Sequence, residues 1–492
     1  MKGKNAEPAA PLRSNWFTDP DCTDQTIEIP SFGEPPALSE CKQMVRSLQL
    51  PAEHFRLIVL ICMHIAICCI SLICVAMIYS EFYIFYRPKE LFGAVVVILS
   101  FAVVSLLFAF ARISFGYFVG FYFYTMILGY LWLNHFSEYS YNHELTGLSA
   151  ATSAVAFLLP ALFIRSPVRQ IWIPSPKAFE RFLSFILLLA AATVVLGASY
   201  NFRFVAFDDI YSFRNTLKLP TILDYLIEIT SNVLSPFAFA CFVERKYFWR
   251  AGAVLFLLLF LYPITLSKFA LFTPAWLVIM VLLSRIFEAR IAVIVSLLVP
   301  MVVGVILFVL FRNGAIPYEA AIPYFGLINF RMITIPSLAM EYYNYFFSAH
   351  DLTYFCQIRL LKPFVSCPYQ EPLAIVIYNA FQIGGNFNAS LFATEGIASV
   401  GPLFAPFSAL ACGLVIGFGN RLSAGLPPSF ILISAAVLGQ IFLNIPFTTA
   451  MLSHGVGILF LLWYLTPRPT VERGRSVDLR PIQPLPNRPE LS

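Results

Sequence analysis

The sequence predicts an all-α fold, that of a polytopic integral membrane protein. Of its 492 residues, 59% are hydrophobic and only 12% are charged, whereas soluble chains carry about 25% charged residues. About twelve apolar segments have the length of a helix that crosses a bilayer, and one long polar stretch, 312–395, separates them. These segments are apolar throughout and do not alternate with polar residues, which disfavours a membrane β-barrel.

Twelve transmembrane helices are therefore expected, with the polar stretch as one large loop between the ninth and the tenth. The seventh and eighth share an apolar stretch that is too long for one span, and a turn from Pro263 to Lys268 divides it. In chain order the expected helices cover residues 57–79, 91–111, 114–134, 146–164, 181–198, 220–242, 249–264, 270–286, 290–311, 397–417, 428–445 and 450–466.

Both ends of the chain are polar and contain several prolines, and both are predicted to be cytoplasmic. Residues 1–55 are expected to form a disordered tail, 56–466 the transmembrane domain, and 467–492 a second tail. With both tails inside, most of the 32 Lys and Arg residues fall in cytoplasmic segments, as the positive-inside rule requires. The loop 312–395 then lies on the external face of the membrane.

The sequence lacks the motifs of several enzyme and binding classes. It contains no phosphate-binding P-loop, no HExxH zinc motif and no CxxC pair. The six histidines are scattered, so no metal and no cofactor is expected. The basic residues are spread over many loops, which argues against a nucleic-acid partner. Cys356 and Cys367 share the external loop, where an oxidising compartment would permit them to pair or leave them as free thiols.

Polar residues near the external ends of helices five to eight are candidate binding residues. Arg203 and Arg214 lie in one external loop, where they could clamp an anionic ligand or pair with neighbouring acids. Asp224 and Glu228 share one face of the sixth helix, which implies a polar cavity or a place at the membrane interface. Lys268 stands at the external turn, where it either lines a dipped turn or extends to the headgroups.

The large loop holds the remaining candidates. Arg312 and Arg331 offer positive charge, and Asn388 and Glu395 stand just before the tenth helix. His350 is the one histidine of this loop. A histidine can act as a general base near neutral pH, although a structural role is the alternative.

Four features together resemble a family, the bacterial polysaccharide polymerases that extend lipid-linked repeat units (O-antigen or oligosaccharide repeat-unit polymerases). Two features concern topology: about a dozen spans with both tails inside, and one large external loop in the C-terminal half. The turn 266–271, Leu-Ser-Lys-Phe-Ala-Leu, is similar to the family's Ser-Arg/Lys turn between two short helices. Residues 388–391, Asn-Ala-Ser-Leu, with the glycines and serine of 396–401, resemble its entry into the helix that follows the loop.

The resemblance implies a metal-independent glycosyltransferase in the bacterial inner membrane. Its substrate would be a polyprenyl-diphosphate-linked oligosaccharide, which the enzyme polymerises at the external face. The resemblance also implies that Arg331 contacts donor or acceptor and that Lys268 is the basic turn residue. Cations would stabilise the leaving diphosphate, and a base must deprotonate the acceptor hydroxyl. The candidate bases are His350, Glu395, Asp208 and Glu228, and the candidate substrate-binding residues are Arg203, Arg214, Lys268, Arg312 and Asn388.

Two other functions fit the same topology. One is an O-antigen-ligase-like transferase that passes the glycan to another acceptor. The other is a lipid-linked oligosaccharide flippase or another multi-pass transporter. Transporters typically hold charges near the midplane of several helices, whereas the polar residues here are expected in the external loop. Membrane lipid is an expected partner, and a chain-length regulator and a flippase are candidate protein partners.

Overall fold

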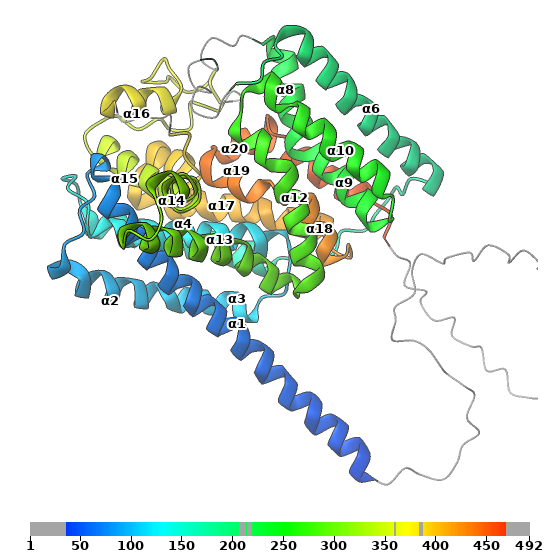
Figure 1. The fold of residues 1–492 in the computed structure, drawn as a ribbon, viewed down its shortest axis with the longest axis horizontal. Helices are drawn as coiled ribbons and strands as arrows, with labels where there is room; N and C mark the ends of the chain where they lie inside the picture. The colour runs from blue at the N-terminus through cyan, green and yellow to red at the C-terminus, as the bar shows by residue number, and fades with distance from the viewer. Residues whose placement is uncertain (1–35, 206–212, 214–218, 359–360, 383–386, 469–492) are drawn as a thin grey trace, which may run out of the picture.

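The structure is a computed structural model that describes residues 36–205, 213, 219–358, 361–382 and 387–468, with side chains from residue 54 onward. In this part of the chain, ten helices are long and apolar enough to cross a membrane, which confirms an all-α polytopic membrane protein (Figure 1). They are α1 (Pro36–Ile78), α2 with α3 (Leu91–Ala102, Leu106–Phe110), α4 (Phe115–Asn134), α5 (His143–Phe163), α6 (Pro176–Tyr200), α8 with α9 (Thr221–Ile229, Ser235–Glu244), α10 with α11 (Phe248–Phe260, Tyr262–Thr265), α12 (Lys268–Ile286), α13 (Ala289–Arg312) and α17 (Ser399–Ser423).

Helix α4 is the centre of the bundle, because every residue from Phe115 to Leu133 is buried. The Ser114 hydroxyl caps its start by accepting a hydrogen bond from the Tyr117 amide at 3.1 Å. Gly116 lets α17 approach closely, and its amide donates to Asn420 Oδ1 at 2.7 Å. The lower hydropathy of α4 compared with the other spans reflects tyrosine and glycine residues that pack against neighbouring helices and not against lipid.

Three segments differ from the sequence-based expectation. Helix α1 begins at Pro36, inside the stretch expected to be disordered, and Figure 1 shows its first half extending away from the bundle. Residues 1–35 of that predicted tail, and 469–492 of the other, lie outside the described residues. The last two expected helices are each broken in two. They are α18 and α19 (Pro428–Ser434, Leu438–Asn444), followed by α20 and α21 (Phe447–Leu452, Val456–Leu465).

The first part of the expected external loop is a helix that is packed into the bundle. Residues 318–347, here called the inserted helix, run without a break through α14 (Tyr318–Phe325), the π-helix η5 (Gly326–Thr334) and α15 (Ile335–Phe347). It packs against α1, α4 and α13. Every residue of α15 except Tyr345 is buried. This stretch is therefore part of the helical bundle, unlike the solvated loop that its polar residues suggested.

Polar side chains attach the inserted helix to its neighbours. Asn329 Nδ2 donates to Ser71 Oγ at 2.8 Å and to the Met301 carbonyl at 3.1 Å. Ser337 Oγ donates to the Met126 carbonyl at 2.9 Å. Ser71, Met301 and Met126 all lie about two helical turns or more inside the ends of their helices. The Asn329 amide nitrogen and the Ser337 hydroxyl thus find acceptors within the bundle, as donors in an apolar surrounding must.

The two ends of the bundle need separate names. The disulfide end carries the C-terminal ends of α1, α4 and α13 and the connection 348–372. The tail end carries the start of α6 and the C-terminal end of α17, where the Val168 amide donates to the Arg421 carbonyl at 3.2 Å. Most of the candidate site residues lie at or near the disulfide end.

Candidate functional site

Residues 387–401 form a re-entrant segment, which enters the bundle from the disulfide end and returns to it. The Phe392 ring lies 5.1 Å from that of Phe123 and 6.0 Å from that of Phe157, centroid to centroid, in the middle of α4 and α5. Ten residues later, the Pro402 carbonyl accepts a hydrogen bond from Ser149, near the disulfide end of α5. The chain reverses at Gly401, whose φ of +75° lies in the region that favours glycine. The span expected at 397–417 therefore lies mostly on the second arm of a hairpin, which runs from the disulfide end toward the tail end.

Glu395 lies on the π-helix η6 (Phe392–Ala398) of this re-entrant segment, and it is only 5% exposed. Its Oε1 accepts hydrogen bonds from the amide and the hydroxyl of Thr448, each at 2.9 Å. Its Oε2 accepts from the Thr394 hydroxyl at 2.5 Å. Three donors thus occupy both carboxylate oxygens, and they tie the re-entrant segment to α20. The placement of Glu395 in a solvated loop is corrected to a buried position inside the bundle.

A second carboxylate is tied to the other end of the same short helix. Glu228 Oε2 accepts from Asn232 Nδ2 at 2.7 Å and lies 3.6 Å from His454 Nε2. His454 follows α20 at the break before α21, and its side chain is 14% exposed, whereas that of Glu228 is 41% exposed. Asn232 belongs to the π-helix η4 (Thr230–Leu234), and π-helices occur frequently at functional sites.

His454, Thr448 and Asn232 were not among the residues singled out from the sequence. The placement of His454 depends on the break between α20 and α21, which a hydropathy pattern hides inside one apolar segment. The break places Gly455 at a φ of +83°, so that the preceding His454 can face α8. The triplet Ser-His-Gly at 453–455 was the one local sign of an interruption in that segment.

A third carboxylate, which is buried like that of Glu395, belongs to α15. Glu341 is fully buried, and the Tyr141 hydroxyl donates to its Oε2. The Tyr141 hydroxyl oxygen also lies 2.9 Å from Asn134 Oδ1, which lies 2.5 Å from His143 Nδ1. Burial raises the pKa of Glu341 from 4.5 to about 7. Since Tyr141 and Asn134 lie in or beside the α4–α5 connection, this network is located at the disulfide end.

Arg331 stands on the π-helix η5 with its side chain exposed, whereas Asn329 two residues earlier is buried. Among the described residues, no carboxylate forms an ion pair with Arg331. Arg312 is exposed at the end of α13, and Asn388 is exposed between buried Phe387 and Ala389. All of these accessible polar groups belong to elements that meet at the disulfide end.

Two of the predicted binding residues share one corner of that end. The Arg203 amide donates to the Pro263 carbonyl at 3.0 Å. Asn201 Nδ2 donates to the same carbonyl at 3.1 Å and to that of Ile264 at 2.9 Å. Lys268 begins α12 directly after this turn, in which Leu266 has a φ of +49°. Residues 201–205 thus pack on the turn that precedes Lys268, while Arg214 and Asp208 lie outside the described residues.

His350 is separated from the buried carboxylates. Its ring stacks on that of Phe346 with a centroid distance of 3.9 Å, and its Nδ1 lies 2.7 Å from the Phe346 carbonyl. The side chain is exposed at the disulfide end. In the described part of the chain, no hydrogen bond, ion pair or ring contact links His350 to Arg331 or Glu395, so these three candidate site residues do not form one cluster.

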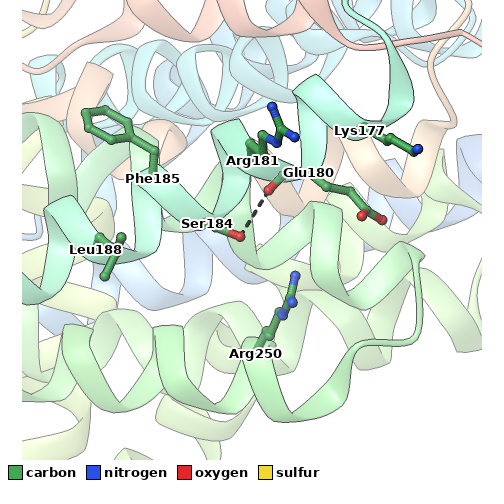
Figure 2. A pocket seen from close by; sticks show the side chains of 7 residues that line it. All are labelled: Lys177, Glu180, Arg181, Ser184, Phe185, Leu188 and Arg250. Atoms are coloured by element: carbon green, nitrogen blue, oxygen red, sulfur yellow. Dashed lines mark hydrogen bonds between the residues drawn. The ribbon is translucent and has the colours of Figure 1, made fainter.

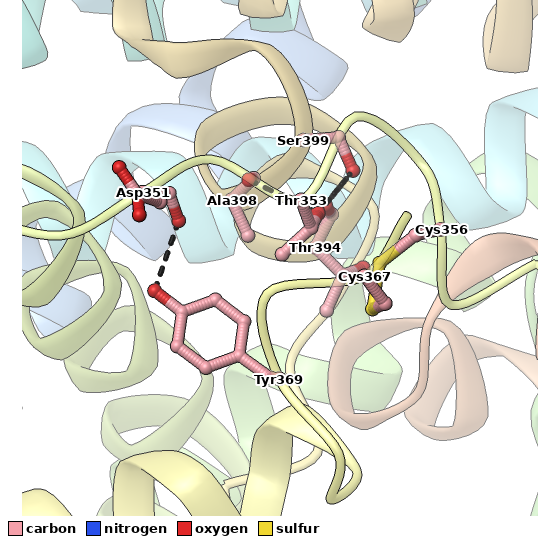
Figure 3. Close-up of a disulfide and its surroundings, with 8 residues drawn as sticks. All are labelled: Asp351, Thr353, Cys356, Cys367, Tyr369, Thr394, Ala398 and Ser399. Carbon is pink, nitrogen blue, oxygen red and sulfur yellow. Dashed lines mark hydrogen bonds between the residues drawn. A yellow bond between two sulfur atoms is a disulfide. The ribbon is translucent and has the colours of Figure 1, made fainter. Parts of the chain in front are cut away.

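The connection after His350 is fixed to the re-entrant segment (Figure 3). Cys356 and Cys367 form a disulfide, which settles the pairing that the sequence left open. The Thr353 amide donates to the Ala398 carbonyl at 2.8 Å and the Tyr354 amide to that of Ser399 at 3.1 Å. These bonds satisfy carbonyl groups at the end of η6 and hold the reversal of the chain in place.

No metal site is formed by the described residues, which contain no group of three or more His, Cys, Asp or Glu side chains suited to one ion. Comparison of the chain with models of protein families, with curated proteins and with solved structures finds no match.

Proposed function

We propose that this protein is a membrane glycosyltransferase that polymerises polyprenyl-diphosphate-linked oligosaccharide repeat units at the external face of the bacterial inner membrane. The observation that carries the proposal is the attachment of two carboxylates, Glu395 and Glu228, to the two ends of α20. The two carboxylates lie on or beside the re-entrant segment, and the exposed cations lie closer to the disulfide end. This arrangement offers both functions that the transfer needs, a base and positive charge.

The cations would bind the diphosphate of the donor. Arg331 presents an exposed guanidinium group that has no ion pair among the described residues. Its planar set of donors suits phosphate oxygens. Arg203, Lys268 and Arg312 provide further positive charge, with Arg214 as a candidate beyond the described residues. This charge would stabilise the diphosphate as it leaves with the electron pair of the broken bond.

The pair Glu228 and His454 would accept the proton. The acceptor hydroxyl oxygen attacks the anomeric carbon of the donor, the bond from that carbon to the diphosphate breaks, and the hydroxyl proton passes to Glu228. His454 and Asn232 orient this carboxylate from one side, and 41% of its side chain remains exposed. We assign Glu395 to positioning α20, because its two oxygens already accept three hydrogen bonds. His350 would contact the glycan near the surface.

The disulfide supports the orientation that the proposal requires. Structural disulfides persist in oxidising compartments and are rare in the cytoplasm. A bond between Cys356 and Cys367 is therefore expected where the disulfide end faces the external side of the membrane. With an even number of crossings, both termini would then be cytoplasmic. Membrane lipid, a chain-length regulator and a flippase remain the proposed partners.

One observation favours a second candidate, a flippase for lipid-linked oligosaccharides. Broken helices and charges inside the bundle are typical of transporters. Glu395 and Glu341 are both buried, and the last two membrane segments are discontinuous. From the sequence, a transporter was disfavoured because the polar residues were expected in a solvated loop. The burial of these two acids removes that objection. A ligase-like transferase would use the same groups with a different acceptor.

The test is deletion of the gene in its host, followed by electrophoresis of the surface polysaccharide. A polymerase predicts loss of the long-chain ladder with retention of a single repeat unit on the surface. Arg331→Ala should fail to restore the ladder, whereas Arg285→Ala, an exposed arginine at the tail end, should restore it. Loss of even the single repeat unit from the surface would favour the flippase, and an unchanged ladder would reject the proposal.

A further inference from the structure

A cavity of about 410 Å³ opens on the surface at the tail end, on the side of the bundle formed by α6 and α10 (Figure 2). Helix α10 packs against α6. Figure 2 shows Arg250 on α10 pointing toward α6. The lining residues are Lys177, Glu180, Arg181, Ser184, Phe185, Leu188 and Arg250.

The cavity carries an excess of positive charge. Lys177, Arg181 and Arg250 contribute three cations, while Glu180 is the one acid in the lining. Arg245, from outside the lining, lies 3.6 Å from Glu180 Oε1. The Tyr247 hydroxyl donates to the same oxygen at 3.4 Å. Glu180 is thus already compensated by an arginine beyond the cavity, and the three lining cations are left to attract an anion.

Aromatic rings hold Arg250 at the mouth of the cavity. Its guanidinium carbon lies 5.4 Å from the centroid of the Tyr247 ring and 5.9 Å from that of Phe242. Cation–π contacts of this kind restrict a guanidinium group without neutralising its charge. Arg250 therefore remains available as a donor to an anionic group between the two helices.

The wall beyond the cations is apolar and faces outward. Phe185 and Leu188 follow Arg181 by about one and two turns along α6, and they are 57% and 69% exposed. They belong to a candidate membrane span, Pro176–Tyr200, so the surface that they expose is a lipid-facing surface. Trp249 beside Arg250 is 93% exposed, and tryptophan is enriched at the level of the headgroups.

We propose that this cavity binds an anionic phospholipid, with its phosphate between Lys177, Arg181 and Arg250 and an acyl chain along Phe185 and Leu188. Basic pockets between membrane helices bind the headgroups of such lipids. A soluble phosphate would use the cations alone, whereas the adjoining apolar wall suits a ligand that carries a hydrocarbon chain. The site lies at the opposite end of the bundle from the proposed transfer site, and it does not depend on that function.

The experiment is native mass spectrometry of the purified full-length protein, delipidated in detergent and titrated with cardiolipin, phosphatidylglycerol or phosphatidylcholine. We expect the two anionic lipids to bind at least tenfold more tightly than phosphatidylcholine. The triple variant Lys177→Gln, Arg181→Gln, Arg250→Gln should lose that preference. Arg285→Gln, which removes one exposed charge at the same end, and the double variant Lys89→Gln, Lys362→Gln, which removes two exposed charges at the disulfide end, should keep it.

Three outcomes would overturn the proposal. The first is equal binding of anionic and zwitterionic lipids to the wild-type protein. The second is an equal loss of preference in the tail-end triple variant and in the disulfide-end double variant, which would indicate general surface charge. The third is displacement of the lipid by millimolar glycerol phosphate, which would assign the site to a soluble phosphate ester. Melting curves in detergent check that every variant is folded, since all the substituted side chains are on the surface.

Discussion

Glu395 accepts hydrogen bonds from both the backbone amide and the hydroxyl group of Thr448, each at 2.9 Å. The two residues come from segments that hydropathy separates, a presumed loop and the connection just before the last expected helix, 450–466. Their contact joins the re-entrant segment to the short helix α20, whose other end carries His454 beside Glu228. A change at Thr448 should therefore act on the position of α20 as well as on Glu395.

Thr448→Val removes one of the three hydrogen bonds to the buried carboxylate. A hydrogen bond to a charged group contributes about 2 kcal/mol, so the free energy of unfolding should fall by about that amount. Thr448→Ser retains the hydroxyl and should remain close to the wild type. Thermal unfolding of both variants in the same detergent checks this expectation, and equal stability of the valine and serine variants would contradict it.

Glu341 should make stability depend on pH. Its pKa is raised from 4.5 to about 7 in the folded protein, so the folded state holds the proton more tightly than the unfolded state. The resulting stabilisation is complete below about pH 4.5 and is lost as the pH rises through about 7. The loss amounts to about 3 kcal/mol at 1.36 kcal/mol per pKa unit.

Melting temperatures at pH 5 and pH 8 test this dependence. The wild-type protein should be less stable at pH 8, whereas Glu341→Gln, which cannot ionise, should flatten the profile. Glu319→Gln changes an exposed acid on the same inserted helix and should keep the wild-type profile. A wild-type slope in the Glu341→Gln protein would show that another group is responsible.

Gly304 tests the packing of the inserted helix. A Cβ at this position would collide with the Asn329 side chain, whereas a Cβ at Gly252 would meet no atom within 4 Å. Gly304→Ala should destabilise the protein by about 1–3 kcal/mol through overpacking. Gly252→Ala should be neutral or slightly stabilising, since alanine favours a helix. Equal melting temperatures of the two variants would indicate that residues 318–347 do not pack against α13.

The spans were predicted well where a helix is apolar and unbroken. The expected helices 114–134 and 290–311 correspond to Phe115–Asn134 and Ala289–Arg312. A continuous apolar run has no other stable arrangement in a bilayer. The inserted helix was not expected inside the bundle, because Asn329, Arg331 and Glu341 lower its hydropathy. A sequence does not distinguish polar residues that find partners inside a bundle from polar residues that face water.

The candidate site was predicted only in part. Arg203 and Lys268, two basic residues on the side where the positive-inside rule expects few, belong to segments that pack together at one corner of the disulfide end. Glu395 and Glu228 were named, but their common neighbour α20 was hidden inside a segment expected to be one straight helix. Breaks such as the one at Gly455 depend on packing against α8 and η4, and packing is not visible in one sequence.

Glu228→Gln should slow the proposed transfer about 100-fold or more, because a general base contributes at least that factor. Asp224→Asn changes an exposed acid one turn earlier on α8 and should retain the wild-type rate. The measurement is the rate of chain extension by purified protein in liposomes at saturating substrate. Equal rates for Glu228→Gln and the wild type would remove Glu228 from the chemistry.

The most direct test of the proposed polymerase uses lipid-linked oligosaccharide extracted from the deletion strain. This material is reconstituted in liposomes with purified wild-type protein or with Arg331→Ala, and its chain length is followed by electrophoresis. The account predicts a ladder of lengthened chains with the wild-type protein and single repeat units with the variant. Single repeat units with the folded wild-type protein, or a ladder with both proteins, would contradict it.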